Sequence, residues 1–287
     1  MTCCSLRDHG VELIGERFGL ASYASCGTTM GMSVIHPWAD RLSSWTYRAR
    51  GTTVRLPVSP LLHTDRSGLP VNGVQSRDHA WILDGSGATA ECAWLEATLP
   101  FDSDPRQLEL FPFAHRVHLR AGVSGRSVFV AIEVDAATDV PVPVCCGFRI
   151  YLSREGRPGD RTIVLPARRR LVSDERLLPT GVTEDVDMKA LSAGVDEVGE
   201  LFALGSDRRI TISSEARRVT VEPGAGFPFA QVRAVSGAPH VVAEVLTAAP
   251  NALNGDAFPV AVRGRPYHAA LRLTVDAFSP GPTRLAA

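Results

Sequence analysis

Lysine is almost missing from this 287-residue sequence, in which Lys189 is the only one. Schiff-base chemistry at any other position is therefore excluded. Arginine supplies nearly all of the positive charge, and 30 basic residues balance 31 acidic ones to a net charge of -1. Because the chain has no basic excess to attract polyanions, we expect neither nucleic acid nor a membrane surface as a partner.

Long apolar runs and metal-binding motifs are missing as well. No run of 18 apolar residues is present to span a membrane, and residues 1–10 contain no apolar segment typical of a signal peptide. We therefore expect a cytoplasmic protein. The six cysteines form no C-x-x-C pair and no zinc spacing, and the eight histidines show no ligand spacing. This pattern predicts reduced thiols, no metal and no cofactor.

Helical patterns are few, and only Met188–Ser192 suggests a short helix. Alternation of polar and apolar residues is frequent, which is typical of half-buried strands. The 20 prolines and 25 glycines are spread along the chain as turns between such strands. The pattern predicts an all-β protein in which residues 1–287 form one large antiparallel β-sandwich domain. The clearest strands are expected at His115–Arg120, Ser127–Val134, Arg209–Ser213, Arg218–Glu222 and Leu271–Asp276.

Six segments, in order, resemble the aldose 1-epimerase (galactose mutarotase-like) family, and together they extend from about Ser5 to Phe278. No one of them is diagnostic, but their order and spacing are those of the family. They are G-T-T-M-G at 27–31 with H-P-W-A-D-R-L at 36–42, G-L-P-V-N-G-V at 68–74, F-P-F-A-H-R at 111–116, P-V-C-C-G-F-R-I-Y-L at 143–152, L-P-T-G at 178–181, and V-V-A-E-V-L-T-A-A-P-N-A at 241–252.

This resemblance implies a galactose mutarotase-like supersandwich with an open groove for a sugar ring. Family members usually carry one or two further strands before the region that matches Cys4–Gly15, so we expect either that an edge strand is missing here or that Met1 is not the native start. The family interconverts the anomers of a sugar, using a glutamate as general base and a histidine as general acid, with a second histidine and an arginine holding the substrate. We therefore expect a small sugar or sugar-like substrate and a monomer or homodimer.

Four positions correspond to the family's principal site residues, and two of these positions carry a different residue here. Glu244 matches the base, and Arg41 matches the substrate-positioning arginine, although it can equally form a structural ion pair with Asp40. The two histidine positions differ, because Arg149 stands at the acid position and Asn72 at the second histidine. Arginine keeps its proton and asparagine cannot titrate, so neither can replace a histidine in proton transfer.

Other residues are candidates for the missing roles. Tyr151 follows Arg149 by two residues and should share its strand face, so Tyr151 or His79 could protonate a ring oxygen, as could water. Trp38 lies three residues before Arg41 and is the best candidate for stacking on a sugar. Glu200 stands beside Gly199, which occupies the slot of another family carboxylate.

Three functions remain open at this point. The first is a retained aldose 1-epimerase-like isomerase with Glu244 as base. The second is a repurposed enzyme that isomerises or cyclises a secondary-metabolite intermediate, and the third is a carbohydrate-binding protein without catalysis. The loss of both histidines is what keeps the second and third alternatives in play.

Overall fold

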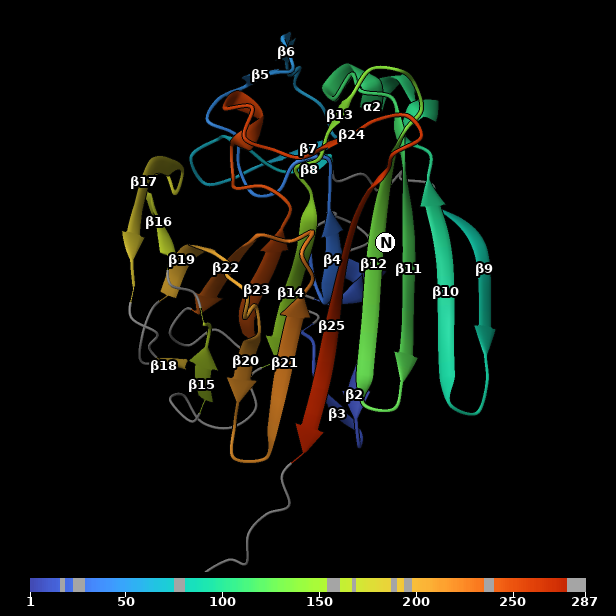
Figure 1. Cartoon of the computed structure of the whole chain (residues 1–287), viewed down its shortest axis with the longest axis vertical. Helices are drawn as coiled ribbons and strands as arrows, with labels where there is room; N and C mark the ends of the chain where they lie inside the picture. Colours follow the sequence, from blue (N-terminus) through green and yellow to red (C-terminus); the bar gives the residue numbers. More distant parts are fainter. Residues whose placement is uncertain are drawn as a thin grey trace, which may run out of the picture.

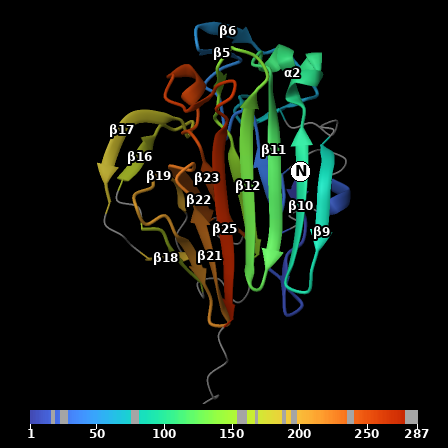
Figure 2. The ribbon, with the colours of Figure 1, turned by 45° about the vertical axis from the view of Figure 1, so that its right-hand side comes forward.

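The computed structural model describes residues 1–15, 19–22, 29–74, 81–153, 161–166, 169–186, 190–193, 198–234 and 240–277. Antiparallel strands dominate these residues, and most of them belong to two large sheets that face each other (Figure 1 and Figure 2). The expected all-β sandwich is therefore confirmed. None of the helices in the described ranges is long and apolar enough to cross a membrane.

The eight-stranded sheet carries most of the residues singled out by their sequence. Its central strands, β14 and β23, pair along their whole length, and β22 follows on the far side of β23. In spatial order its strands are β1 (Thr2–Cys3), β4 (Met32–Ile35), β14 (Gly147–Ser153), β23 (His240–Leu246), β22 (Phe229–Ala234), β19 (Val198–Ala203), β16 (Arg169–Ser173) and β17 (Pro179–Asp185).

The nine-stranded sheet contains the longest strands, which alternate polar and apolar residues as predicted. Four of the five strands expected from sequence lie in its centre, and the fifth is β20 beside them. In spatial order the strands are β18 (Ala190–Ala193), β15 (Arg161–Val164), β20 (Ile210–Ser213), β21 (Arg217–Pro223), β25 (Tyr267–Ala277), β12 (Ser127–Ala136), β11 (His115–Ser124), β10 (Cys92–Leu99) and β9 (Ile82–Ala88).

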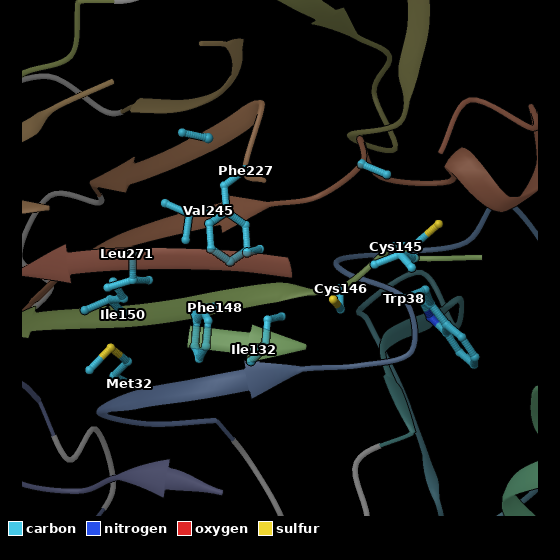
Figure 3. Close-up of a cluster of buried hydrophobic side chains, with 14 of the residues drawn as sticks. Met32, Trp38, Ile132, Cys145, Cys146, Phe148, Ile150, Phe227, Val245 and Leu271 are labelled. Carbon is cyan, nitrogen blue, oxygen red and sulfur yellow. The ribbon is translucent and has the colours of Figure 1, made fainter. Parts of the chain in front are cut away.

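The main hydrophobic core fills the space between the two sheets. Phe148 and Ile150 of β14 and Val245 of β23 point into it from one sheet, and Ile132 and Leu271 reach it from the other (Figure 3). All five side chains are at most 3% exposed. Because successive strand residues face opposite sides, the residues between them in β14 and β23 must face outward. This alternation is what places Arg149 and Glu244 on the outer face.

Short elements gather at one end of the sandwich, at the top of Figure 1. One of them, the helix α2, begins after Asp104, whose carboxylate accepts a hydrogen bond from the backbone N–H of Arg106 as an N-cap, and Pro105 opens the first turn. The elements at this end are β5 (Thr46–Ala49), β6 (Thr52–Arg55), β7 (Leu62–Thr64), β8 (Pro70–Val74), η1 (Phe101–Ser103), α2 (Pro105–Leu110), β13 (Val142–Pro143), η2 (Ala252–Asn254) and β24 (Val260–Ala261); β2 (Arg7–Asp8) and β3 (Val11–Glu12) pair elsewhere.

A loop near the C-terminal end of the sequence fastens the β5–β6 hairpin to the rest of the protein. Three of its side chains accept hydrogen bonds from the backbone N–H groups of Ser43, Arg48 and Arg50. The acceptors are Asn251 Oδ1 at 3.0 Å, Asn254 Oδ1 at 3.0 Å and Asp256 Oδ1 at 3.1 Å, respectively. The hairpin is therefore held by groups more than 200 residues away in sequence.

The helix predicted at Met188–Ser192 is wrong in the part that the structure describes. Residues 187–189 lie outside the described ranges, but Ala190–Ala193 form strand β18 and pair with β15. Pairing with an extended neighbour satisfies the backbone groups of this short segment, whereas so short a helix is marginal by itself. The described cysteines, namely Cys3, Cys4, Cys92, Cys145 and Cys146, are free thiols.

Candidate functional site

Arg149 of β14 and Glu244 of β23 lie directly opposite each other on paired strands. Arg149 Nε and Nη2 both donate to Glu244 Oε1, at 2.8 and 2.7 Å. The carboxylate is fully buried, and the guanidinium side chain is 10% exposed. A buried carboxylate is retained only when it is paired or functional, and the facing arginine supplies the pair.

The surroundings of Arg149 fix its protonation state. Burial by itself would lower the pKa of Arg149, but the nearby Glu244, Tyr151 and Asp40 raise it, and the net result lies above the ordinary value for arginine. Arg149 is therefore a permanent cation. It can donate hydrogen bonds to a ligand or stabilise negative charge, but it cannot release a proton.

Asp40 extends the ion pairing away from the sheet. Its Oδ2 accepts from Arg233 Nη2 at 2.9 Å and from Arg41 Nη1 at 3.3 Å, and its side chain is 1% exposed. Arg233 Nη2 also donates to Gln231 Oε1 at 3.0 Å. Since Gln231 is the cross-strand partner of Glu244, these groups are continuous with the Arg149–Glu244 pair.

Arg41 and Asn72 reach the same region from outside the large sheet, since Asn72 lies on β8 and Arg41 forms a β-bridge with Val71 of that strand. Arg41 Nε donates to Asp65 Oδ2 at 2.9 Å. Burial would raise the pKa of Asp65, but hydrogen bonds from Leu69 and Arg41 outweigh it and hold this pKa below its usual value. The backbone N–H of Asn72 donates to Asp40 O at 2.6 Å, with Asn72 at a φ of 62° that asparagine tolerates better than most residues. Arg41 thus makes both structural ion pairs and a contact within the site.

Hydrogen bonds, ion pairs and strand pairing connect these residues, and we call them the polar cluster: Asp40, Arg41, Asn72, Arg149, Gln231, Arg233 and Glu244. With Asp65, its three carboxylates cancel its three guanidinium charges. Within the described residues, four buried atoms of the cluster have no hydrogen-bond partner. They are Glu244 Oε2, Asp40 Oδ1, Asn72 Oδ1 and Arg233 Nε.

Unpartnered buried polar atoms are rare, because each costs about 1–3 kcal/mol. Three of the four are acceptors, so a ligand that satisfies them must bring hydrogen-bond donors. Phosphate or carboxylate ligands bring acceptors, and the arginines that could receive them are already paired with carboxylates. The cluster therefore suits an uncharged molecule with several hydroxyl groups.

Comparisons with known proteins agree with the sheet arrangement. No family model matches the sequence, and no curated protein matches it. Solved structures do match. A galactose mutarotase-like protein from Clostridium acetobutylicum superposes with a TM-score of 0.83 at 14% identity, over 96% of this chain and 89% of that one. The galactose 1-epimerase from Lactobacillus acidophilus gives 0.77 at 15% identity, over 97% and 89%. A galactose mutarotase-like protein from Lactobacillus casei gives 0.69 at 13% identity, over 93% and 90%.

The chain has the galactose mutarotase-like fold. This fold brings together four of the residues singled out by their sequence, namely Arg41, Asn72, Arg149 and Glu244. Sequence reasoning missed Gln231 and Arg233 as members of the same cluster. Their signal was present, since they alternate with the buried Ala230, Val232 and Ala234 along β22.

Tyr151 lies on the same face of β14 as Arg149, as the spacing predicted, and is 3% exposed. Its hydroxyl is 2.7 Å from the hydroxyl of Thr29, and its ring meets His240 edge-on at 5.1 Å. His240 was not singled out by its sequence context. The other expected donor, His79, lies outside the described residues.

Trp38 and Glu200 do not join the polar cluster, which corrects two expectations. Trp38 is 1% exposed and belongs to the main core, at one end of the buried cluster and close to Cys145 in Figure 3, so it offers no open face to a sugar. Glu200 pairs across the strands with Val232, on the opposite face from Gln231, and it forms an ion pair with Arg170. One residue of register separates Glu200 from the cluster.

A second buried polar group lies beside the cluster's loops. His115 Nδ1 is 2.5 Å from Phe113 O and therefore donates to it, so His115 Nε2 must accept from His36 Nε2 at 2.7 Å. Burial lowers the pKa of His115 to about 4, although the Phe113 carbonyl and Asp102 oppose the shift. His115 is therefore the neutral partner in this hydrogen bond at pH 7. Among the described residues, no group of three His, Cys, Asp or Glu side chains is arranged to hold a metal ion.

Proposed function

We propose that this protein is an aldose 1-epimerase-like isomerase for an uncharged, hydroxyl-rich sugar or sugar-like substrate, with Glu244 as general base. The observation that carries the proposal is that the two oxygen atoms of the Glu244 carboxylate have different surroundings. Oε1 is fixed by two hydrogen bonds from Arg149, and Oε2 is buried without a partner among the described residues. A base needs this combination of a fixed orientation and a free oxygen.

The rest of the polar cluster would orient the ring. Asp40 Oδ1 and Asn72 Oδ1 can accept from substrate hydroxyls, and Arg233 Nε can donate to one. These bonds replace water that a free sugar loses on binding, which makes several simultaneous contacts worthwhile. The similarity of the fold to a galactose 1-epimerase supports a sugar over other polyols.

The reaction needs two proton movements that cancel over a full cycle. Glu244 Oε2 takes the proton of the anomeric hydroxyl, the anomeric C–O bond becomes a carbonyl, and the bond from that carbon to the ring oxygen breaks. The ring oxygen receives a proton from Tyr151 or water, while Arg149 stabilises the negative charge that develops on it. Rotation about the bond from the carbonyl carbon to C2, followed by the reverse steps, closes the ring with the other configuration.

Anomer exchange of D-galactose and D-glucose, followed by polarimetry and NMR, tests this function. We expect the wild-type protein to exceed the spontaneous rate and Glu244→Gln to lose about 100-fold or more of the gain, which is the usual contribution of a general base. Glu133→Gln, on the outer face of the nine-stranded sheet, is the matched control and should keep full activity. Equal activity of Glu244→Gln and Glu133→Gln would contradict the proposal.

A second candidate is carbohydrate binding without catalysis, and the occupant of the acid position favours it. Arg149 cannot deliver a proton, so a site without another donor binds a sugar and leaves it unchanged. Calorimetric titration with D-galactose, beside the exchange assay, separates the two, because binding of the free sugar without faster anomer exchange identifies the second function. If Arg149→His then gains exchange activity, only the proton donor was missing.

A further inference from the structure

A second set of side chains lies on the same outer face as the polar cluster and is apolar. We call it the apolar strip: Ile35, Ala39, Leu171, Leu201, Phe229, Leu246 and Ala249. It is a hydrophobic cluster of its own, separate from the main core between the sheets. It therefore does not serve to hold the two sheets together.

The strand register places the apolar strip directly beside the polar cluster. Cross-strand partners share a face, and one row of partners continues from Glu244 to Gln231, then to Leu201 and Leu171. Strands lie about 4.8 Å apart, so this row passes from carboxylate to leucine within roughly 10 Å and reaches Leu171 at roughly 14 Å. One bound molecule of moderate size can contact both ends.

The members of the strip differ in how well the protein covers them. Ile35, Leu201 and Leu246 are at most 1% exposed, whereas Leu171, Phe229 and Ala249 are only partly buried. A further row runs from Leu246 to Phe229 on the adjacent strand, so the partly covered side chains flank Gln231. Partly exposed apolar surface thus lies next to the buried polar atoms that have no hydrogen-bond partner among the described residues.

A free hexose on the polar cluster would leave this apolar surface uncovered, because sugar hydroxyl groups find no hydrogen-bond partners among leucine and phenylalanine side chains. We propose that the site takes an uncharged sugar-like ring that carries an apolar alkyl or aryl substituent, with the ring on the polar cluster and the substituent on the apolar strip. This inference rests on the proposed function, since the polar cluster must bind the hydroxylated ring. It specifies which sugars the site prefers.

Matched pairs of galactose derivatives test the inference by calorimetric titration. Methyl and phenyl β-D-galactoside form one pair, and 6-O-methyl and 6-O-benzyl D-galactose form the other, so the substituent is varied at two ends of the ring. We expect the aryl member of at least one pair to bind about tenfold or more tightly, because burying apolar carbon contributes several-fold per methylene.

Two variants locate the effect. Leu171→Gln should reduce the aryl preference to less than threefold and leave the affinity for the methyl derivative unchanged. Val182→Gln is the control, because Val182 is 55% exposed and belongs to neither the apolar strip nor the polar cluster. Both variants should retain the wild-type unfolding midpoint within a few degrees.

The outcomes separate the two proposals. If the methyl derivatives bind and Glu244→Gln weakens them, the polar cluster works as proposed; an equal affinity for aryl and methyl members, or an aryl preference that survives Leu171→Gln, then overturns the present inference alone. If no galactose derivative binds, the proposed function has failed, and this inference fails with it.

Discussion

The outer faces of the two sheets both carry ion pairs, but under opposite conditions. On the nine-stranded sheet, Glu96 forms an ion pair with Arg120 at 3.2 Å, and the two side chains are 43% and 62% exposed. On the eight-stranded sheet, the Arg149–Glu244 pair is almost entirely buried. The charged groups of the first face are exposed to water, whereas those of the second face are buried.

The difference indicates which face is built for a ligand. Exposed pairs contribute about 0–1 kcal/mol each and need no further explanation. Buried charges are costly, and leaving their oxygens without partners is costlier still. Within the described residues, the outer face of the eight-stranded sheet combines a buried charge pair with an unpartnered carboxylate oxygen, and the following predictions test the contrast between the two faces.

Removing the cation from each face should give the largest difference. Arg149→Met leaves Glu244 buried without its partner, so we expect the free energy of unfolding to fall by about 3–5 kcal/mol. Arg120→Met removes the equivalent partner of Glu96 on the exposed face and should cost about 0–1 kcal/mol. Denaturant unfolding measures both. Equal losses in the two variants would show that burial does not distinguish the faces.

Acid should weaken the His36–His115 pair, in which the His115 side chain is fully buried. The pKa of His115 is about 4 in the folded protein and about 6.5 in an unfolded chain, so only the unfolded chain binds a proton between these values. Stability should therefore fall as the pH is lowered from about 6.5 to 4, by up to about 3 kcal/mol. Denaturant unfolding at several pH values measures it.

Replacing His115 isolates this contribution. His115→Phe should be less stable at pH 7 and should show a smaller loss between pH 6.5 and 4 than the wild-type protein. The control His268→Gln, at an exposed histidine, should retain the wild-type loss. An unchanged pH dependence in His115→Phe would assign the effect to other groups.

The smallest effect on stability is expected at Asn72, where the loss should appear in binding. Asn72→Gly keeps the backbone at φ 62° without strain, so unfolding should change by less than about 1 kcal/mol. It removes one unpartnered acceptor, and the affinity for methyl galactoside should fall about two- to tenfold. Asp256→Gly, also at positive φ but outside the polar cluster, should bind as the wild type does.

Much of the fold was predictable because alternation is a local property. The strands at Ser127–Val134 and Leu271–Asp276 appear where the pattern placed them, inside β12 and β25. Helix α2 was missed, although Asp104 and Pro105 form a recognisable helix start. The segment Ala190–Ala193 was predicted as helix because its pairing with β15 depends on residues distant in sequence.

The candidate site was predictable only in part. The positions of Glu244 and Arg149 follow from alternation and family resemblance, but their direct pairing depends on the register of two strands 95 residues apart. Trp38 could not be assigned to the core from sequence, because its burial requires Tyr47 and the β5–β6 hairpin to pack against it. Glu200 is adjacent to Leu201, the cross-strand partner of Gln231, and therefore faces the opposite side of the sheet from the polar cluster.

The loop at Asn251–Asp256 has a consequence for how the protein is made. Its acceptors lie 206 to 208 residues after the backbone groups that they hold, and Arg233 lies 193 residues after Asp40. During synthesis, the β5–β6 hairpin cannot form its hydrogen bonds to Asn254 and Asp256 until most of the chain has left the ribosome. The polar cluster cannot be complete before Glu244 is made, and the nine-stranded sheet cannot be complete before its strand β25, so both should form late in synthesis. A nascent chain that stops before residue 233 would contain several strands of both sheets but neither Arg233 nor Glu244.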